Sequence, residues 1–280
     1  MRLRNVKEIY VPGETYTLYA LGDIHLGSSS CDKDALFDTI AEIRKNPNAR
    51  WIGMGDYMEW ISVQDKRWHG GGIDKTIIAD PEQLDMLGDI YVDKISTILR
   101  PIMHQCWSMG EGNHETAFQK HHPFGLVKMI LKACGADEDI YTGWAAITKV
   151  QFEDKDKHRT SISIFHSHGW QAGRLSGAKV NQLDHMGGWI DGCRIYLQGH
   201  SHDNVVKMKA KLEANNDHTK LRAFNSFGAH TSSFLRTYQQ DACNYGEQKG
   251  YPPVPIGGLW FELHPTREGV KSRAVQGDLW

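Results

Sequence analysis

The chain has 280 residues, 40% of them hydrophobic and 24% charged, and a formal net charge of −2. It is long enough to bury a large core, and its overall charge excludes a general electrostatic attraction to nucleic acid or to an anionic membrane. The five cysteines are scattered without a Cys-x-x-Cys pair, and no stretch resembles a signal peptide or a membrane span, so we expect a cytoplasmic protein with no membrane partner.

The hydrophobic pattern predicts strands that alternate with helices up to residue 135, followed mostly by strands. The predicted strands cover residues 15–21, 50–54, 102–109, 144–152, 160–165, 194–197, 205–212, 221–227, 258–263 and 270–274. The predicted helices cover residues 32–44, 81–100, 123–134 and part of 174–190. We expect a single domain over residues 1–280, with two long connections, 57–80 and 228–256, that set substrate choice.

The first predicted strand gives way to two residue types that bind metals. Gly22 is followed by Asp23 and His25, which are separated by one apolar residue. Side chains at positions i and i+2 point the same way on an extended backbone. The pair could therefore offer a carboxylate oxygen and an imidazole nitrogen to one divalent cation, although a strand that ends in a polar turn would look the same.

This construction recurs along the chain. Five times an apolar, strand-like run stops at residues of metal-ligand type, and a glycine adjoins each set. Ligands at the ends of neighbouring strands converge on one edge of a sheet, where loops carry function on a rigid scaffold. The five sets are Asp23 with His25, Asp56, Asn113 with His114, His168, and His200 with His202.

This ordered series resembles the calcineurin-like metallophosphoesterase superfamily. The family pattern is Asp-x-His, Gly-Asp-x-x-Asp/Glu, Gly-Asn-His-Asp/Glu, a His followed by Gly, and Gly-His-x-His, and all five blocks occur in order between residues 22 and 202. The resemblance implies an α/β (α+β) fold, a four-layer αββα sandwich in which two mixed β-sheets are flanked by helices, with a metal centre at one edge.

The resemblance also implies a binuclear centre with a bridging hydroxide that attacks phosphorus. Its ligands would be Asp23, His25 and His202 on one metal, Asn113, His168 and His200 on the second, and Asp56 on both. His114 would stay off the metals and protonate the leaving group as a general acid.

The ligand types agree with such a centre. They are imidazoles, carboxylates and one amide without a thiolate, which favours manganese, iron or zinc over a structural zinc–sulfur site. We expect two divalent ions, manganese first, with iron, zinc or nickel as alternatives. Two such ions, together with Asp23, Asp56 and a hydroxide, leave one net positive charge, which attracts a phosphate oxyanion.

Glu59 lies three residues after Asp56, where the family places the carboxylate that orients the catalytic histidine. An imidazole needs a partner on its second nitrogen to fix its tautomer and direction. We therefore expect Glu59 to pair with His114. Glu115 is the rival partner, and either could instead be a solvated surface acid.

Two further residues are candidate substrate contacts. His166 lies two positions before His168, so either could reach the metal, but the glycine after His168 favours His168 as the ligand. His166 is then a candidate for a contact to phosphate or for a residue behind the ligands. Arg174 follows the same loop and could bind phosphate with its fork of donors, or could be an ordinary surface arginine.

The function expected from these residues is hydrolysis of a phosphoester, and a phosphodiesterase or nuclease acting on a nucleotide or nucleic acid is favoured. A histidine acid suits an alkoxide leaving group, and tryptophans beside the motifs could stack a base. The alternatives are a phosphomonoesterase or protein phosphatase and, from a different class, a catalytically inert metal-binding scaffold. The tryptophans are Trp60, Trp68, Trp170 and Trp189.

Overall fold

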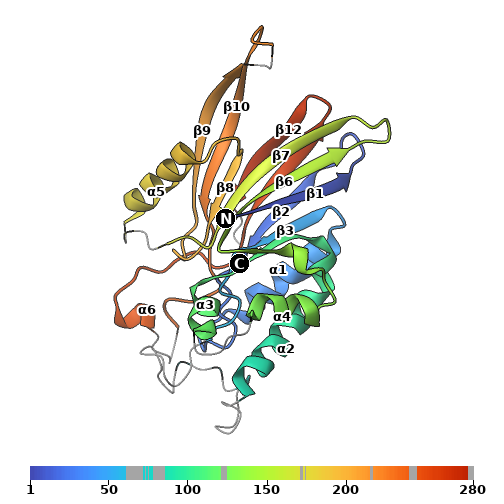
Figure 1. Cartoon of the computed structure of the whole chain (residues 1–280). Coiled ribbons are helices and arrows are strands. Elements are labelled where there is room, and N and C mark those ends of the chain that lie inside the picture. The colour runs from blue at the N-terminus through green and yellow to red at the C-terminus, as the bar shows by residue number, and fades with distance from the viewer. Residues whose placement is uncertain are drawn as a thin grey trace.

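Two six-stranded mixed β-sheets form the centre of the computed structural model (Figure 1). Each sheet contains both parallel and antiparallel neighbours. The predicted fold class, two mixed sheets flanked by helices, is confirmed. The structure describes residues 1–60, 72, 74, 76–77, 86–120, 125–170, 173, 175–214, 217–239 and 245–276.

The first sheet, here called the β2 sheet, contains four consecutive parallel strands, which run from β2 to β5. A C-terminal hairpin adds β11, which is antiparallel to β2, and β12, which is antiparallel to β11. In spatial order the strands are β12 (Gly269–Gln276), β11 (Leu259–Thr266), β2 (Tyr16–Leu21), β3 (Ala49–Gly53), β4 (Cys106–Gly110) and β5 (Tyr141–Gly143).

The second sheet, here called the β7 sheet, joins an N-terminal edge strand to the later part of the chain. Strands β7, β8 and β10 are parallel, and the hairpin β9–β10 extends beyond the other strands (Figure 1). In spatial order the strands are β1 (Arg2–Ile9), β6 (Ala145–Glu153), β7 (Arg159–Ser167), β8 (Ile195–Gln198), β10 (Leu221–His230) and β9 (Val205–Ala214).

Alternation along the strands creates the layers. In β2, Leu18 and Ala20 pack between the two sheets, whereas Tyr19 and Leu21 pack under the helices on the other face. Because successive side chains of a strand point to opposite faces, one buried apolar strand can serve two cores.

Helices cover the outer face of each sheet (Figure 1). Helices α1 (Lys33–Lys45), α2 (Leu87–Leu99) and α4 (Leu126–Ala133) pack on the β2 sheet, and α5 (Ser176–Trp189) packs on the β7 sheet. The four layers are therefore α, β, β and α. Shorter helical segments are α3 (Asn113–Gln119), α6 (Tyr245–Gln248), η2 (Arg100–Gln105) and η3 (Glu138–Ile140). Among the described helices, none is long and apolar enough to cross a membrane.

The predicted strand over residues 102–109 is only half correct. Its first part is the 3₁₀ helix η2, because Pro101 suits the first turn of a helix. The buried amide of Gln105 then donates to the carbonyls of Ile43, Asn46 and Ala49. Strand β1 was not predicted, since its charged residues hide the alternation, and β5 is too short to give a pattern.

Candidate metal centre

The predicted ligands follow strands from both sheets. Asp23, Asp56 and Asn113 come after β2, β3 and β4, while His168 and His200 come after β7 and β8. These strands run parallel within each sheet. Their carboxyl ends therefore meet at one edge of the sandwich, and the side chains that follow gather there.

Backbone hydrogen bonds join the first two of these loops. The N–H of Asp23 donates to the carbonyl of Gly55 at 2.9 Å, and the N–H groups of Ile24 and His25 donate to the carbonyl of Asp56 at 2.9 and 3.0 Å. The carbonyl of Asp23 in turn accepts hydrogen bonds from residues 233 and 234. The loops are thus fixed relative to each other before any ligand binds.

The ligand residues adopt a backbone conformation that the sequence pattern did not reveal. Asp23, His25, Asp56, His200 and His202 all have left-handed φ angles, between 46° and 68°. The side chains of Asp23 and His25 therefore converge through tight turns and not through the extended backbone that we expected. A non-glycine residue pays roughly 1–2 kcal/mol for this conformation, and such strain concentrates at functional sites.

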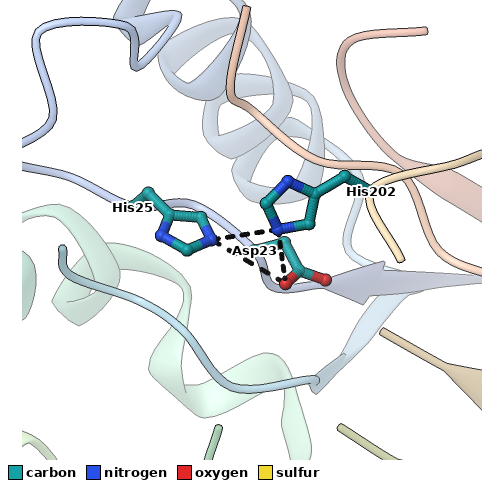
Figure 2. A group of neighbouring side chains, drawn as sticks. All are labelled: Asp23, His25 and His202. Atoms are coloured by element: carbon teal, nitrogen blue, oxygen red, sulfur yellow. Dashed lines mark hydrogen bonds and ion pairs between the residues drawn. The ribbon is translucent and has the colours of Figure 1, made fainter. Parts of the chain in front are cut away.

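The first ligand group is Asp23, His25 and His202 (Figure 2). The Nε2 atoms of the two histidines lie 3.2 Å apart. The Oδ1 atom of Asp23 is 3.9 Å from Nε2 of His25 and 3.4 Å from Nε2 of His202. Asp23 and His25 are buried, whereas the side chain of His202 is 31% exposed and opens the group to solvent.

The second group lies beside the first and is made by Asp56, Asn113, His168 and His200. Nε2 of His168 lies 2.9 Å from Oδ1 of Asn113, 3.3 Å from Oδ2 of Asp56 and 3.3 Å from Nδ1 of His200. Nδ1 of His168 donates to the carbonyl of Met54 at 2.9 Å, so in the neutral form of the ring Nε2 carries the lone pair. The ring is therefore oriented to bind a cation.

Asp56 belongs to both groups. Its Oδ2 is 3.3 Å from Nε2 of His168 and 3.8 Å from Nε2 of His25, while Oδ1 accepts the N–H of His114 at 2.8 Å. His114 also lies close enough to His25 and Asp56 to form a third grouping of ligand atoms. The structure thus brings together all seven predicted ligands and His114.

The carboxylate oxygens and imidazole nitrogens of these two groups are suited to bind cations. Oδ1 of Asp23 is buried and accepts no hydrogen bond from any described residue. Among the described residues, no lysine or arginine forms an ion pair with Asp23 or Asp56. Buried carboxylates and facing imidazole nitrogens are costly without a positive charge between them. Groups of nitrogen and oxygen donors that could hold metal ions are therefore present.

The pKa shifts of these residues also show that positive charge near the carboxylates is favourable. Burial opposes ionisation of Asp56, but the rings of His168 and His114 hold the pKa of this carboxyl well below its usual value. Burial likewise disfavours charging of His168 and His25. Asp56 nevertheless raises the pKa of His168 to about 10, and Glu59 raises that of His25 to about 9.

Glu59 contacts His114 as predicted, but through its backbone carbonyl and not through its carboxylate. The carboxylate of Glu59 lies against His25, with Oε2 2.9 Å from Nδ1 of that ring. It is the backbone carbonyl of Glu59 that meets Nδ1 of His114. Spacing placed Glu59 correctly next to both rings, but it could not distinguish the side chain from the carbonyl.

Glu115 is a buried anchor and not the partner of His114. Its carboxylate accepts N–H groups from Gly112, Asp56 and Tyr57 and from the indole of Trp60, at 2.8–3.1 Å. Burial and the charge of Asp56 raise the pKa of Glu115 to about 7, and the three backbone N–H donors oppose this rise. Glu115 thereby ties the Asp56 loop to the Asn113 loop.

Glycines allow the same two loops to touch. A Cβ on Gly112 would lie 2.1 Å from Oδ1 of Asp56, and a Cβ on Gly55 would lie 2.4 Å from the backbone nitrogen of Gly112. Gly55 also has a φ of +90°. The glycine before each ligand is therefore needed for close approach, as the sequence suggested.

A buried polar cluster that the sequence did not assign supports the last loop. The ring of His230 contacts Oγ of Ser201 through Nδ1 at 2.8 Å and the carbonyl of Lys179 through Nε2 at 3.1 Å. Lys179 donates to Asp203 at 2.7 Å. These contacts fix residues 201 and 203 on either side of His202, and only tertiary structure could identify them.

The expected substrate contacts are not supported. His166 is buried in the core, where its Nε2 lies 3.1 Å from Oγ of Ser108 and 3.0 Å from Oγ1 of Thr148, and burial lowers its pKa to about 3. It lies inside strand β7, whereas His168 follows the strand. Trp60 is also buried. Arg174 and Trp68 lie outside the described residues.

The predicted substrate loop over residues 228–256 is partly structural. Residues 228–230 belong to β10. Ser233 and Phe234 are buried, and they donate to the carbonyl of Asp23 through Oγ and N–H respectively, both at 3.0 Å. The first part of this stretch therefore positions a ligand and is not a free rim. Most of residues 61–85 lies outside the described residues.

Comparisons with known proteins add little. No protein-family model and no curated protein matches the chain. A solved structure described as "GAP50 the anchor in the inner membrane complex of Plasmodium" is similar at 11% identity and a TM-score of 0.40, over 94% of this chain and 84% of that chain. A likeness this distant says nothing about what this chain does.

Proposed function

We propose that this protein is a metal-dependent phosphoester hydrolase of the calcineurin-like metallophosphoesterase type. The observation that supports it best is the convergence of Asp23, His25, His168, His200 and His202, together with Asn113, around Asp56, with a buried oxygen left without a donor. Structural ion pairs of buried carboxylates normally include a lysine or an arginine, whereas this arrangement calls for bound cations.

Two divalent cations, manganese first, are the cofactors that we propose. One would be held by Asp23, His25 and His202, the other by Asn113, His168 and His200, and Asp56 would serve both. When bound, they supply Lewis acidity toward the phosphoryl oxygens and make water a competent nucleophile near neutral pH.

His114 is the proposed general acid. Its backbone N–H is held by Oδ1 of Asp56, and its Nδ1 meets the carbonyl of Glu59. Because a carbonyl only accepts, Nδ1 carries a hydrogen, and Nε2 is the nitrogen left to protonate the departing oxygen. The ring lies edge-on to His25, with centroids 4.6 Å apart.

A diester with an aromatic or nucleobase group is the substrate that we favour. Trp144, which the sequence reasoning missed, packs edge-on against the ring of His168 at 5.2 Å and remains partly exposed. Trp170 is 42% exposed, and its carbonyl accepts hydrogen bonds from Gln182 and Gln198. The indole of Trp144 against His168 and the exposed side chain of Trp170, two residues further along the chain, offer surfaces on which a base can stack.

The test is hydrolysis of bis(p-nitrophenyl) phosphate and p-nitrophenyl phosphate by metal-free protein to which manganese is added. We expect turnover that requires manganese and favours the diester. The matched control is His158→Ala, which changes an exposed histidine outside the site. Strong preference for the monoester would replace the diesterase assignment with a monoesterase. Tight manganese binding without turnover of any ester would support an inert scaffold and overturn the proposal.

A further inference from the structure

Two oxygen atoms of Glu59 contact two different imidazole rings of the candidate site. Oε2 of its carboxylate lies 2.9 Å from Nδ1 of His25, and its backbone carbonyl meets Nδ1 of His114. Its own N–H donates to the carbonyl of Leu26 at 3.0 Å, which fixes this backbone to the loop that follows His25. One residue thus bridges a predicted metal ligand and the predicted acid.

The chemistry of the two acceptors differs. A carboxylate beside an imidazole N–H fixes the tautomer and also makes the opposite nitrogen a stronger donor toward a cation. In His25 that opposite nitrogen is Nε2, which faces Nε2 of His202 at 3.2 Å and Oδ2 of Asp56 at 3.8 Å. A neutral carbonyl fixes the tautomer of His114 without placing a full negative charge on its ring.

We propose that Glu59 is a positioning residue whose side chain sets the cation affinity of His25 while its backbone sets the direction of His114. This inference rests on the hydrolase function proposed above. It differs from the arrangement in which the carboxylate pairs with the acid, because it assigns the carboxylate to metal binding alone. Substitution of the Glu59 side chain should therefore weaken cation binding by His25 and leave the orientation of His114 unchanged.

The geometry makes the separation testable. Glu59→Ala removes the partner of His25 but keeps the carbonyl that holds His114. Glu59→Gln keeps the shape and one acceptor oxygen but removes the charge. His114→Ala removes the acid alone. Glu111→Gln is the matched control, since Glu111 lies on the neighbouring loop, and its carboxylate contacts Gln119, at 3.4 Å, and the side chain of Tyr141.

The first experiment is calorimetric titration of metal-free protein with manganese chloride. We expect binding to weaken by about 10- to 100-fold in Glu59→Ala, a typical cost of losing a partner of a metal-bound histidine, and by less in Glu59→Gln. Glu111→Gln should bind as the parent does. Parental affinity in Glu59→Gln and Glu59→Ala would overturn the inference. If Glu59→Ala does not fold, by circular dichroism, Glu59→Gln alone decides.

The second experiment measures dependence on the leaving group at saturating manganese. A p-nitrophenolate leaves without a proton, whereas an alkoxide needs the acid. Glu59→Ala should keep the parental ratio of alkyl to aryl ester turnover, and His114→Ala should lose it. If Glu59→Ala behaves as His114→Ala does, the carboxylate acts on the acid and the inference is wrong. A parent protein inactive on every ester would contradict the hydrolase function, while the titration would still test the pairing with His25.

Discussion

Within the described part of the chain, two places gather aspartates and histidines within metal-binding distance, and they differ in what their lone pairs face. At the sheet edge, Oδ1 of Asp23 has no described donor, and Nε2 of His25 faces Nε2 of His202. In the turn between β6 and β7, by contrast, Oδ1 of Asp154 accepts the N–H groups of residues 156 and 158, and Oδ2 accepts Nε of Arg267 at 3.1 Å.

Closeness of aspartates and histidines is therefore weaker evidence for a metal site than a buried lone pair without a hydrogen-bond donor. In both places the ligand atoms lie within 4.8 Å of one another. The turn is neutralised by Arg267, which contacts both Asp154 and Asp156. The sheet edge has no such partner among the described residues, so its carboxylates and imidazoles remain available to a cation.

The largest expected effect comes from changing one carboxylate in each place. Asp56→Asn removes the shared charge while keeping an acceptor for the N–H of His114. We expect bound manganese, measured by elemental analysis, to fall from two ions per chain to at most one. We also expect turnover to fall roughly a thousandfold or more, equivalent to about 4 kcal/mol. Asp154→Asn should change neither; loss of metal from that variant would erase the distinction.

Metal removal should affect stability through the sheet edge alone. A cation that binds only the folded state at a hundred times its Kd adds about 2.7 kcal/mol. For a chain of this size that raises Tm by about 5–10 °C. Differential scanning calorimetry with manganese and with a chelator measures it. The shift should persist in Asp154→Asn and become smaller in Asp56→Asn; an undiminished shift in Asp56→Asn would place the bound metal elsewhere.

A methyl group tests whether the sheet edge is as closely packed as the distances indicate. Gly112→Ala would push against Asp56, so we expect a loss of about 1–3 kcal/mol of unfolding free energy and weaker manganese binding. The control is Gly177→Ala in α5, where the new Cβ has nothing within 4 Å and should stabilise the helix by about 0.5–1 kcal/mol. Urea denaturation measures both, and equal stability of the two variants would contradict the packing.

The smallest expected effect concerns the support behind His202. Ser201→Ala leaves the buried Nδ1 of His230 without its partner, which costs about 1–3 kcal/mol, and should weaken manganese binding a few-fold. Arg267→Ala at the turn should cost less than about 1 kcal/mol, since the Arg267 side chain is half exposed, and leave manganese binding unchanged. Titration of both variants with manganese measures the difference. Weaker manganese binding in Arg267→Ala alone would contradict the role of the contact between Ser201 and His230.

Local patterns predicted the strands and the loops: the apolar run of β2 indicates a strand buried on both faces, and a glycine before Asp56 or Asn113 marks a loop. The four layers and the set of metal ligands were expected from the resemblance to the metallophosphoesterase family. The sequence could not reveal that Glu59 meets His25 through its carboxylate, nor that His230 lies behind Ser201, because those contacts join loops far apart in the chain. The strand that contains His166 ends at Ser167, two residues beyond the predicted end at residue 165, so this side chain packs in the core and is not a substrate contact.

We propose that cations bind the donor atoms around Asp56, where Oδ1 of Asp23 accepts no hydrogen bond from a described residue. Anomalous diffraction from manganese-soaked crystals, recorded at the manganese edge, tests it most directly. The account predicts two peaks about 3.5–4 Å apart on either side of the Asp56 carboxylate, with Asp23, His25 and His202 around one and His168 and His200 around the other. Absence of both peaks, or a peak only at the Asp154 turn, would contradict it.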